Sequence, residues 1–272
     1  MEHTLQYSNL IGEVWSPQTR MNVKTKQGSA ASEAPRAAGS MSDRQRQQGL
    51  IVIVGIVVVA IVVFLVAILA SGNSNVQEID YTAMNATRGA DGAFIIGNPE
   101  APITVVEFAD FGCPHCQTYH VEMQQLVQEY VATGKARFEF RIFPTAGGQQ
   151  TVYAGAVAEC IAEQNPTLFW TAYDRFFELA STGRYFQDGA VIGVVQELGL
   201  SRSEVLDCTS DSDQVSIDVN VGTNLGVTGT PAVMVRYGDG PAQWVSYNGT
   251  TYDRGSVPYS VLGAVIEQAN AS

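Results

Sequence analysis

The chain has 272 residues, of which 46% are hydrophobic, and a formal net charge of −12 at pH 7. From residue 71 onward it carries nine Lys and Arg residues against 23 Asp and Glu residues, a balance of −14. Nucleic-acid binding relies on basic residues that neutralise phosphates, so this balance argues against nucleic acid as a partner. The acidic residues are scattered along the sequence, as on the solvated surface of an exported domain.

The N-terminal part predicts a tail followed by a membrane helix. Residues 1–49 are rich in Gln, Ser, Ala and Arg without apolar periodicity, which is typical of a disordered segment. Residues 50–70 read LIVIVGIVVVAIVVFLVAILA and contain no charge. A helix of this length, at about 1.5 Å per residue, spans a bilayer core of roughly 30 Å. The alternatives are a buried strand, which is rarely so long, and a cleaved signal peptide, whose apolar core has only about 7–15 residues.

The charges on either side of this segment predict its orientation. The basic residues Arg36, Arg44 and Arg46 precede it, whereas Glu78 and Asp80 are the first charges after it. Under the positive-inside rule, the N-terminus stays in the cytoplasm and the rest of the chain is exported while attached to the cell membrane by a single pass.

The chain beyond the membrane segment divides into a linker and one domain. Residues 71–92 are rich in Ser, Asn and Gly and are expected to form the linker. Residues 93–272 have the size of one ordinary domain. A start at Met41 would still give a basic lead into the membrane helix, so the sequence leaves Met1 and Met41 both open as the first residue.

The four cysteines all follow the predicted membrane helix. They are Cys113, Cys116, Cys160 and Cys208, an even number in a compartment that permits disulfides. A structural zinc site would need a second close pair of ligands, but Cys160 and Cys208 are 48 residues apart. We therefore expect redox pairing and predict neither a metal nor another cofactor.

The pattern around the first two cysteines predicts a β-α-β unit. The segment ITVVEFADF, residues 103–111, is β-rich and mostly apolar, as in a buried strand. Residues 115–135 place apolar side chains on one helical stripe that Gly134 can end, and ARFEFRIF then alternates as a second strand. The cysteine pair is therefore expected at the N-terminus of a helix.

A thiol at this position is expected to be reactive. Cys113 would face unpaired backbone N–H groups and the positive end of the helix dipole, both of which stabilise a thiolate. Pro114 suits the first helical turn, and His115 can donate a hydrogen bond or carry positive charge beside the sulfur. Cys116, one turn further along, should be less exposed.

The segment VEFADFGCPHCQTYH resembles the active-site segment of the DsbA-like thiol oxidases, which have the thioredoxin fold. In that family a Cys-Pro-His-Cys disulfide is donated to newly exported proteins. The resemblance implies that Cys113 is the sulfur attacked by the substrate and that Cys116 resolves the mixed disulfide.

Two further positions match the family pattern. LGVTGTPAVMVRY resembles its Gly-Thr-Pro segment, which implies that Pro231 is a cis-proline facing the cysteines and that the backbone of Thr230 holds an extended substrate. Glu107 matches the buried acid beneath the cysteine pair, which implies that it shuttles a proton for Cys116. The alternative is an acid on the wet face of the strand, although its apolar neighbours make both faces look buried.

The resemblance also implies a thioredoxin core with a helical insertion at about residues 149–225. Several segments there have helical spacing, while DQVSIDVNVGTNLG alternates like a strand and the resemblance implies a helix, which we favour. We expect the two remaining cysteines, Cys160 and Cys208, to form a structural disulfide, since some members of the family carry a similar bridge. The rival interpretation is two inert buried thiols.

The sequence thus predicts an α/β protein with a thioredoxin fold, preceded by one transmembrane helix. Its expected function is that of a membrane-anchored extracytoplasmic thiol:disulfide oxidoreductase that oxidises reduced exported proteins. A membrane thiol oxidase would reoxidise the couple. The alternatives are a disulfide isomerase or reductase of the same fold, or a non-enzymatic module that binds a metal or a partner.

Overall fold

The computed structural model describes residues 54–61 and 79–272. Residues 54–61 are helical and belong to a unit separate from the one that contains residues 79–272. No helix among the described residues combines the length and apolar character needed to cross a membrane. The predicted tail 1–49 lies outside the described residues, and so does most of the predicted membrane helix 50–70.

One mixed sheet forms the centre of the larger unit. Its strands are β1 (Ala86–Arg88), β2 (Phe94–Gly97), β3 (Ile103–Ala109), β4 (Arg137–Ile142), β5 (Ala232–Tyr237), β6 (Gln243–Tyr247) and β7 (Thr250–Tyr252). They lie in the order β1-β2-β4-β3-β5-β6-β7. The central strands β3 and β4 are parallel, and β5 pairs with β3 in the antiparallel sense.

The helices confirm the predicted β-α-β unit and helical insertion. The first of them are η1 (Tyr81–Ala83), α2 (Pro114–Leu126) and η2 (Val127–Val131). The insertion contains α3 (Gly148–Gln164), α4 (Pro166–Ser181), α5 (Ala190–Glu197), α6 (Arg202–Cys208) and α7 (Gln214–Asn224), and α8 (Tyr259–Asn270) ends the fold. Helix α2 connects the parallel strands β3 and β4, and the ambiguous segment that becomes α7 is helical, as the family resemblance implies.

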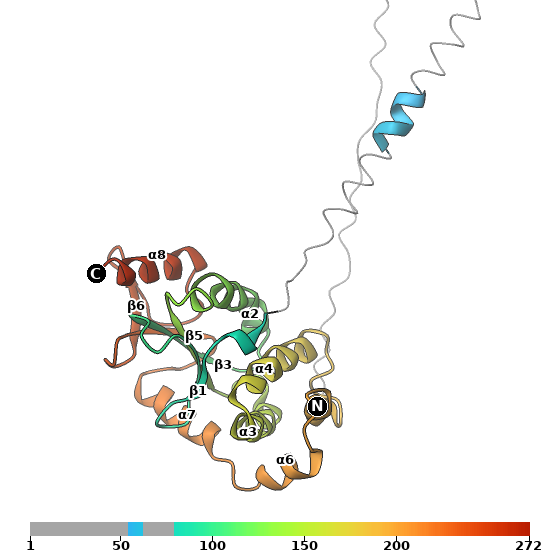
Figure 1. Ribbon diagram of the computed structural model, residues 1–272, viewed down its shortest axis with the longest axis vertical. Coiled ribbons are helices and arrows are strands. Elements are labelled where there is room, and N and C mark those ends of the chain that lie inside the picture. Colours follow the sequence, from blue (N-terminus) through green and yellow to red (C-terminus); the bar gives the residue numbers. More distant parts are fainter. Residues whose placement is uncertain (1–53, 62–78) are drawn as a thin grey trace, which may run out of the picture. The chain divides into compact units, whose positions relative to one another are not determined.

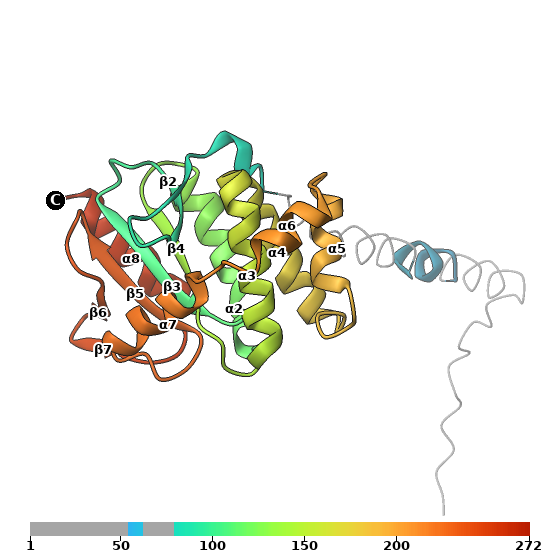
Figure 2. The ribbon, with the colours of Figure 1, turned by 90° about the horizontal axis from the view of Figure 1, so that it is seen from below.

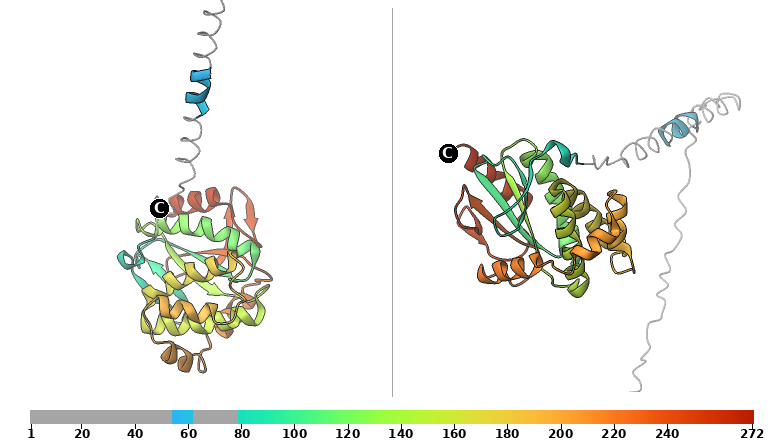
Figure 3. Two further views of the ribbon diagram at one scale, coloured as in Figure 1. Left: turned by 90° about the vertical axis from the view of Figure 1, so that its right-hand side faces the viewer. Right: turned by 60° about the horizontal axis from the view of Figure 1, so that its bottom comes forward.

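The helices cover the sheet on both sides. Helix α7 lies on the side of the sheet opposite α8 (Figure 1). The insertion helices α3 to α6 extend away from the sheet beyond α2 (Figure 2). Helix α2, in green, lies between the red α8 and the yellow insertion helices (Figure 3). Helix α2 therefore packs against both α8 and the insertion.

A cluster of aromatic side chains joins the insertion to the sheet. Phe111, which follows β3, packs edge-on against Phe176 and Phe177 of α4 with ring centroids 5.2 and 5.0 Å apart. Tyr173 of the same helix packs on Phe140 of β4 at 4.7 Å. These rings are fully or almost fully buried, so this contact fixes α4 against the strands that carry the cysteine loop.

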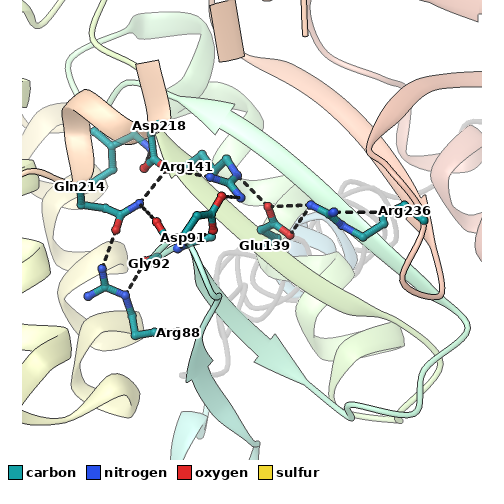
Figure 4. Close-up of polar contacts among 11 residues, drawn as sticks. Arg88, Asp91, Gly92, Glu139, Arg141, Gln214, Asp218 and Arg236 are labelled. Atoms are coloured by element: carbon teal, nitrogen blue, oxygen red, sulfur yellow. Dashed lines mark hydrogen bonds and ion pairs between the residues drawn. The ribbon is translucent and has the colours of Figure 1, made fainter. Parts of the chain in front are cut away.

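The other face of the sheet contains a buried ionic network. Arg141 of β4 donates to Glu139 at 2.7 Å, to Asp218 of α7 at 3.0 Å and to Asp91 at 2.8 Å. Arg236 of β5 approaches the other side of Glu139 at 3.1 Å (Figure 4). Buried charges are tolerated when they are paired in this way, so the network ties α7 and β5 to the centre of the sheet.

The folded unit begins before Ala93, which corrects the expected end of the linker at residue 92. Tyr81 is buried and donates a hydrogen bond to Asp174 of α4 at 2.8 Å. Strand β1 pairs with β2, and Arg88 lies over the ring of Phe94 at 4.4 Å. A strand of three residues has too short a pattern to be recognised among Ser, Asn and Gly residues.

A disulfide lies within the insertion. Cys160 of α3 and Cys208 at the end of α6 are bonded at 1.97 Å, with Cα atoms 5.9 Å apart. The bond connects two helices through cysteines that are 48 residues apart in the chain. The other two cysteines, Cys113 and Cys116, are free thiols.

Candidate active site

The cysteine pair lies where strand β3 passes into helix α2. Cys113 is the N-cap residue, Pro114 is the first residue of the helix, and the Gln117 N–H donates to the Cys113 carbonyl at 3.0 Å. Cys113 is 6% exposed and Cys116 is fully buried. The first cysteine therefore has the greater access to solvent and the direct position at the helix N-terminus, which is where a thiolate is stabilised.

The predicted proline segment lies beside this pair. The Thr230–Pro231 peptide bond is cis, and strand β5 begins at the next residue. Because β5 runs antiparallel to β3, the start of β5 and the end of β3 share one edge of the sheet. The Cys113 thiol donates to the Thr230 carbonyl oxygen at 3.6 Å. The fold thus brings Cys113, Thr230 and Pro231 together.

Two hollows flank the proline turn. One has a volume of about 390 Å³ and is lined by residues that include His115, Glu122 and Pro231. The other, of about 270 Å³, lies toward Trp244 and Arg254 and shares the proline. An extended chain that pairs with the turn would have room for side chains on both sides of it.

His115 lies at the surface beside the sulfur atoms. Its side chain is exposed, and within the described chain its ring makes no hydrogen bond with either cysteine. It does line the larger hollow together with Thr230 and Pro231. The structure therefore places His115 on the hollow beside the proline turn.

Glu107 is fully buried on the face of β3 that points toward α2 and α4. Neither of its carboxyl oxygens has a hydrogen-bond partner within the described residues, and the buried Tyr173 hydroxyl has none either. Burial raises the pKa of Glu107 to about 8, against a smaller opposing contribution from the neighbouring Tyr173 hydroxyl. Glu107 is therefore protonated at neutral pH, and its pKa is close enough to neutral for the carboxyl group to release and take up this proton.

The second thiol, Cys116, is close enough to this carboxyl group for its charge to act on the thiol. Burial raises the pKa of Cys116, and the negative charge of Glu107 raises it further, while the Asp110 backbone acts in the opposite direction. Cys116 is therefore a buried neutral thiol at neutral pH. A neighbouring group that accepts the Cys116 proton would assist any step in which the Cys116 thiol must ionise.

Sequence reasoning missed three polar residues of this region. Asp110 and Tyr173 are fully buried, and Thr145 lies at the surface where its hydroxyl is 2.7 Å from that of Thr230. Asp110 had a signal, since it is a carboxylate in an apolar run three residues before the first cysteine. Tyr173 looked like a packing residue of an aromatic helix, and Thr145 had no signal.

Within the part of the chain that the structure describes, no three His, Cys, Asp or Glu side chains come close enough to hold a metal ion. The described geometry brings together two thiols, a buried carboxyl group and a cis-proline turn.

Comparison with known sequences points to one family. The family model described as Thioredoxin matches residues 90–238. A probable disulfide bond formation protein D of Bacillus cereus is 32% identical over 149 residues, which cover 52% of this chain and 68% of the relative. Disulfide bond formation protein D of Bacillus subtilis is 25% identical over 171 residues, which cover 60% of this chain and 76% of the relative.

Solved structures agree with the fold. The crystal structure of alpha-DsbA1 from Wolbachia pipientis is similar with a TM-score of 0.56 at 21% identity, over 68% of this chain and 94% of that one. The oxidised form of BdbD from Bacillus subtilis gives a TM-score of 0.53 at 19% identity, over 65% and 92% of the two chains. These likenesses confirm the thioredoxin fold with a helical insertion that the sequence predicts.

Proposed function

Since this chain belongs to the DsbA-like family of thiol:disulfide oxidoreductases with the thioredoxin fold, we propose that Cys113 and Cys116 form its redox couple and that the couple donates its disulfide to exported proteins. The observation that carries this proposal is the position of the Cys113 sulfur. It lies at the N-terminus of α2 and 3.6 Å from the carbonyl oxygen that precedes Pro231. A substrate can meet the sulfur and the turn together.

The exchange proceeds in two displacements. A substrate thiolate attacks the Cys113 sulfur of the Cys113–Cys116 disulfide, a mixed disulfide forms, and Cys116 leaves as a thiolate that takes up a proton. A second substrate thiolate then attacks the substrate sulfur of the mixed disulfide and releases Cys113. In total the substrate dithiol loses two electrons and two protons, and the couple becomes the dithiol seen in the structure.

Glu107 is proposed to move the proton of Cys116. The leaving Cys116 sulfur is buried next to the Glu107 carboxyl group, whose pKa is about 8. A neutral Glu107 can give its proton to the departing thiolate, and the carboxylate can take it back when Cys116 attacks in the reverse direction. The same residue therefore serves both directions of exchange.

Four further residues are proposed to assist the exchange with substrate: His115 and Pro114 beside the cysteines, and Thr230 and Pro231 in the proline turn. His115 is exposed on the rim of the hollow and can place positive charge near a thiolate. Pro114 starts the helix without a backbone N–H, and Thr230 offers its backbone to an extended chain.

We further propose that the chain acts outside the cytoplasm, anchored by residues 50–70, and that a membrane thiol oxidase reoxidises it. The charge-free segment and its basic leading flank support the anchor. The relatives named disulfide bond formation protein D support a place in disulfide formation. Net oxidation of many substrates requires an electron acceptor, because each turnover leaves the couple as a dithiol.

The direction of exchange is tested by the reduction potential of the Cys113–Cys116 couple in the purified full chain, measured by equilibration with glutathione buffers. A donor of disulfides should have a potential above about −180 mV, toward the value of about −120 mV of DsbA. A potential near about −270 mV, as in thioredoxin, would assign the chain to the reductases instead.

A further inference from the structure

The carboxylate of Asp110 lies at the junction of the two loops that form the site. Asp110 is fully buried, directly after β3 and three residues before Cys113. It accepts hydrogen bonds from the backbone N–H groups of Gly112, Thr145 and Gly147 at 2.8, 2.7 and 2.7 Å. A buried charge is stable only when it is satisfied in this way, so the cysteine loop and the loop after β4 are fixed to each other.

The two loops approach so closely that glycine is required on both. A Cβ atom on Gly112 would lie 2.5 Å from the Cα atom of Gly147, and one on Gly147 would collide with the carboxylate of Asp110. The two loops are thus in close backbone contact around the carboxylate. Asp110 lies at the base of the cysteine loop as the acceptor that both loops share.

The carboxylate also accepts hydrogen bonds from two hydroxyl groups. Because a carboxylate can only accept, these bonds fix where each hydroxyl proton points. The Thr145 hydroxyl donates to it at 3.1 Å, and the Thr151 hydroxyl donates to its other oxygen. Every partner of Asp110 is a donor, as a carboxylate requires. Thr145 has a single hydroxyl proton, and that proton is used on Asp110.

The Thr145 hydroxyl in turn contacts the proline turn. Its oxygen lies 2.7 Å from the hydroxyl oxygen of Thr230. Because the Thr145 proton points to Asp110, the Thr230 hydroxyl is the donor in this second bond. The chain of bonds therefore runs from Thr230 to Thr145 to Asp110, and it joins the proline turn to the loop that carries Cys113.

We infer that Asp110 and Thr145 are positioning residues for polypeptide substrates: the Asp110 carboxylate orients the Thr145 hydroxyl, and this hydroxyl holds Thr230 beside the Cys113 sulfur. The inference rests on the proposed function and names a determinant of its substrate class. An extended polypeptide must meet the Thr230 backbone and the Cys113 sulfur at once. A small dithiol needs only the sulfur, so the hydroxyl chain affects polypeptides alone.

The test compares two substrates with the full chain, first oxidised with glutathione disulfide. One substrate is an unstructured eight-residue peptide with two cysteines, and the other is dithiothreitol. Rates are measured by quenching the reaction at timed intervals over a range of substrate concentrations. They give the half-saturating concentration and the limiting rate of disulfide transfer. The variants are Thr145→Val, which removes the hydroxyl at nearly constant volume, and Thr145→Ser, which keeps it. Thr133→Val is the matched control, because Thr133 is also exposed and its hydroxyl bonds only backbone carbonyls of its own helical segment.

Thr145→Val should raise the half-saturating peptide concentration about fivefold, the effect expected for the loss of one ordinary hydrogen bond. The limiting rate and the reaction with dithiothreitol should stay unchanged. Thr145→Ser should restore wild-type values, and Thr133→Val should match the wild type. Folding is preserved in Thr145→Val, since the Thr145 backbone N–H still donates to Asp110.

Equal changes for peptide and dithiothreitol, or no change for the peptide, would overturn the positioning role while leaving the proposed function intact. Failure of Thr145→Ser to restore the peptide reaction would also overturn it. A wild-type chain that exchanges with dithiothreitol and not with the peptide would overturn the proposed function, and the positioning role with it.

Discussion

The Cys113 sulfur and the Thr230 carbonyl oxygen lie 3.6 Å apart although 117 residues separate them in the chain. The pairing of β3 with β5 accounts for this, because the end of one strand lies beside the start of the other. The long insertion leaves the sheet after β4 and returns through α7 into the proline turn. The Cys113 thiol and the segment proposed to bind substrate are thus fixed by the same central strands.

Replacing Glu107 with Gln should change how stability depends on pH. The pKa of Glu107 is about 8 in the folded protein, against an ordinary value of 4.5. The folded state therefore binds this proton more tightly than the unfolded chain, and the resulting stabilisation is complete below pH 4.5 and lost as the pH rises to about 8. For a shift of this size the loss is on the order of 4 kcal/mol.

Urea unfolding of the reduced protein at pH 5 and pH 8 measures this loss. Glu107→Gln cannot ionise, so its free energy of unfolding should fall less between the two pH values than that of the wild type. Tyr173→Phe is the companion variant, because it removes the contribution that lowers the pKa of Glu107. An identical pH dependence in wild type and Glu107→Gln would show that Glu107 does not hold its proton as described.

Replacing Arg141 with Met should destabilise the fold by about 3–5 kcal/mol, since it leaves the buried Asp218 without its cation, whereas Glu139 keeps Arg236. The guanidinium contacts Glu139 and Asp218, whose side chains are 3% and 0% exposed. Burial raises the pKa of Asp218 to about 7, and Arg141 opposes that rise. The variant should therefore lose less stability at pH 5, where Asp218 can accept a proton, than at pH 8.

Arg175→Met is the control for this prediction. Arg175 also contacts two carboxylates, Glu178 and Glu197, but both of these are 51% exposed. Its loss should cost under about 1 kcal/mol. Chemical denaturation of both variants tests the comparison, and equal losses would mean that the buried network contributes no more than a surface pair.

Replacing both Cys160 and Cys208 with Ala should lower the free energy of unfolding by about 3–4 kcal/mol, as expected for a loop of this length. The bond lies within the insertion, between α3 and α6, whereas the proposed redox couple lies between β3 and α2. Disulfide exchange by the folded double variant should therefore be unchanged. Loss of exchange without loss of stability would assign this bond a redox role.

The core of the fold was predictable because its signals are local. The run of apolar residues before Cys113, the helical stripe after it and the following strand each have a clear period, and they form β3, α2 and β4. The motifs around the cysteines and Pro231 then placed two distant segments in one site. These segments lie together in the structure.

The missed features depend on contacts between distant residues. Arg141 belongs to the alternating segment ARFEFRIF, and two of its partners, Asp218 of α7 and Asp91 of the loop before β2, lie far from it in the sequence. Asp110 accepts from Thr145 and Gly147, which are 35 and 37 residues further along the chain. The periodicity of a single segment cannot predict such pairings, because they form only when distant segments pack together.

The central claim is that Cys113 alone forms the bond to substrate, and its most direct measurement is the trapping of mixed disulfides by single-cysteine variants of the full chain. Cys116 is fully buried and Cys113 lies at the helix N-terminus. After expression in an oxidising compartment, Cys116→Ala should accumulate covalent complexes on non-reducing electrophoresis, because no neighbouring thiol can expel the substrate. Cys113→Ala should form none. Equal trapping by the two variants, or none by either, would contradict the account.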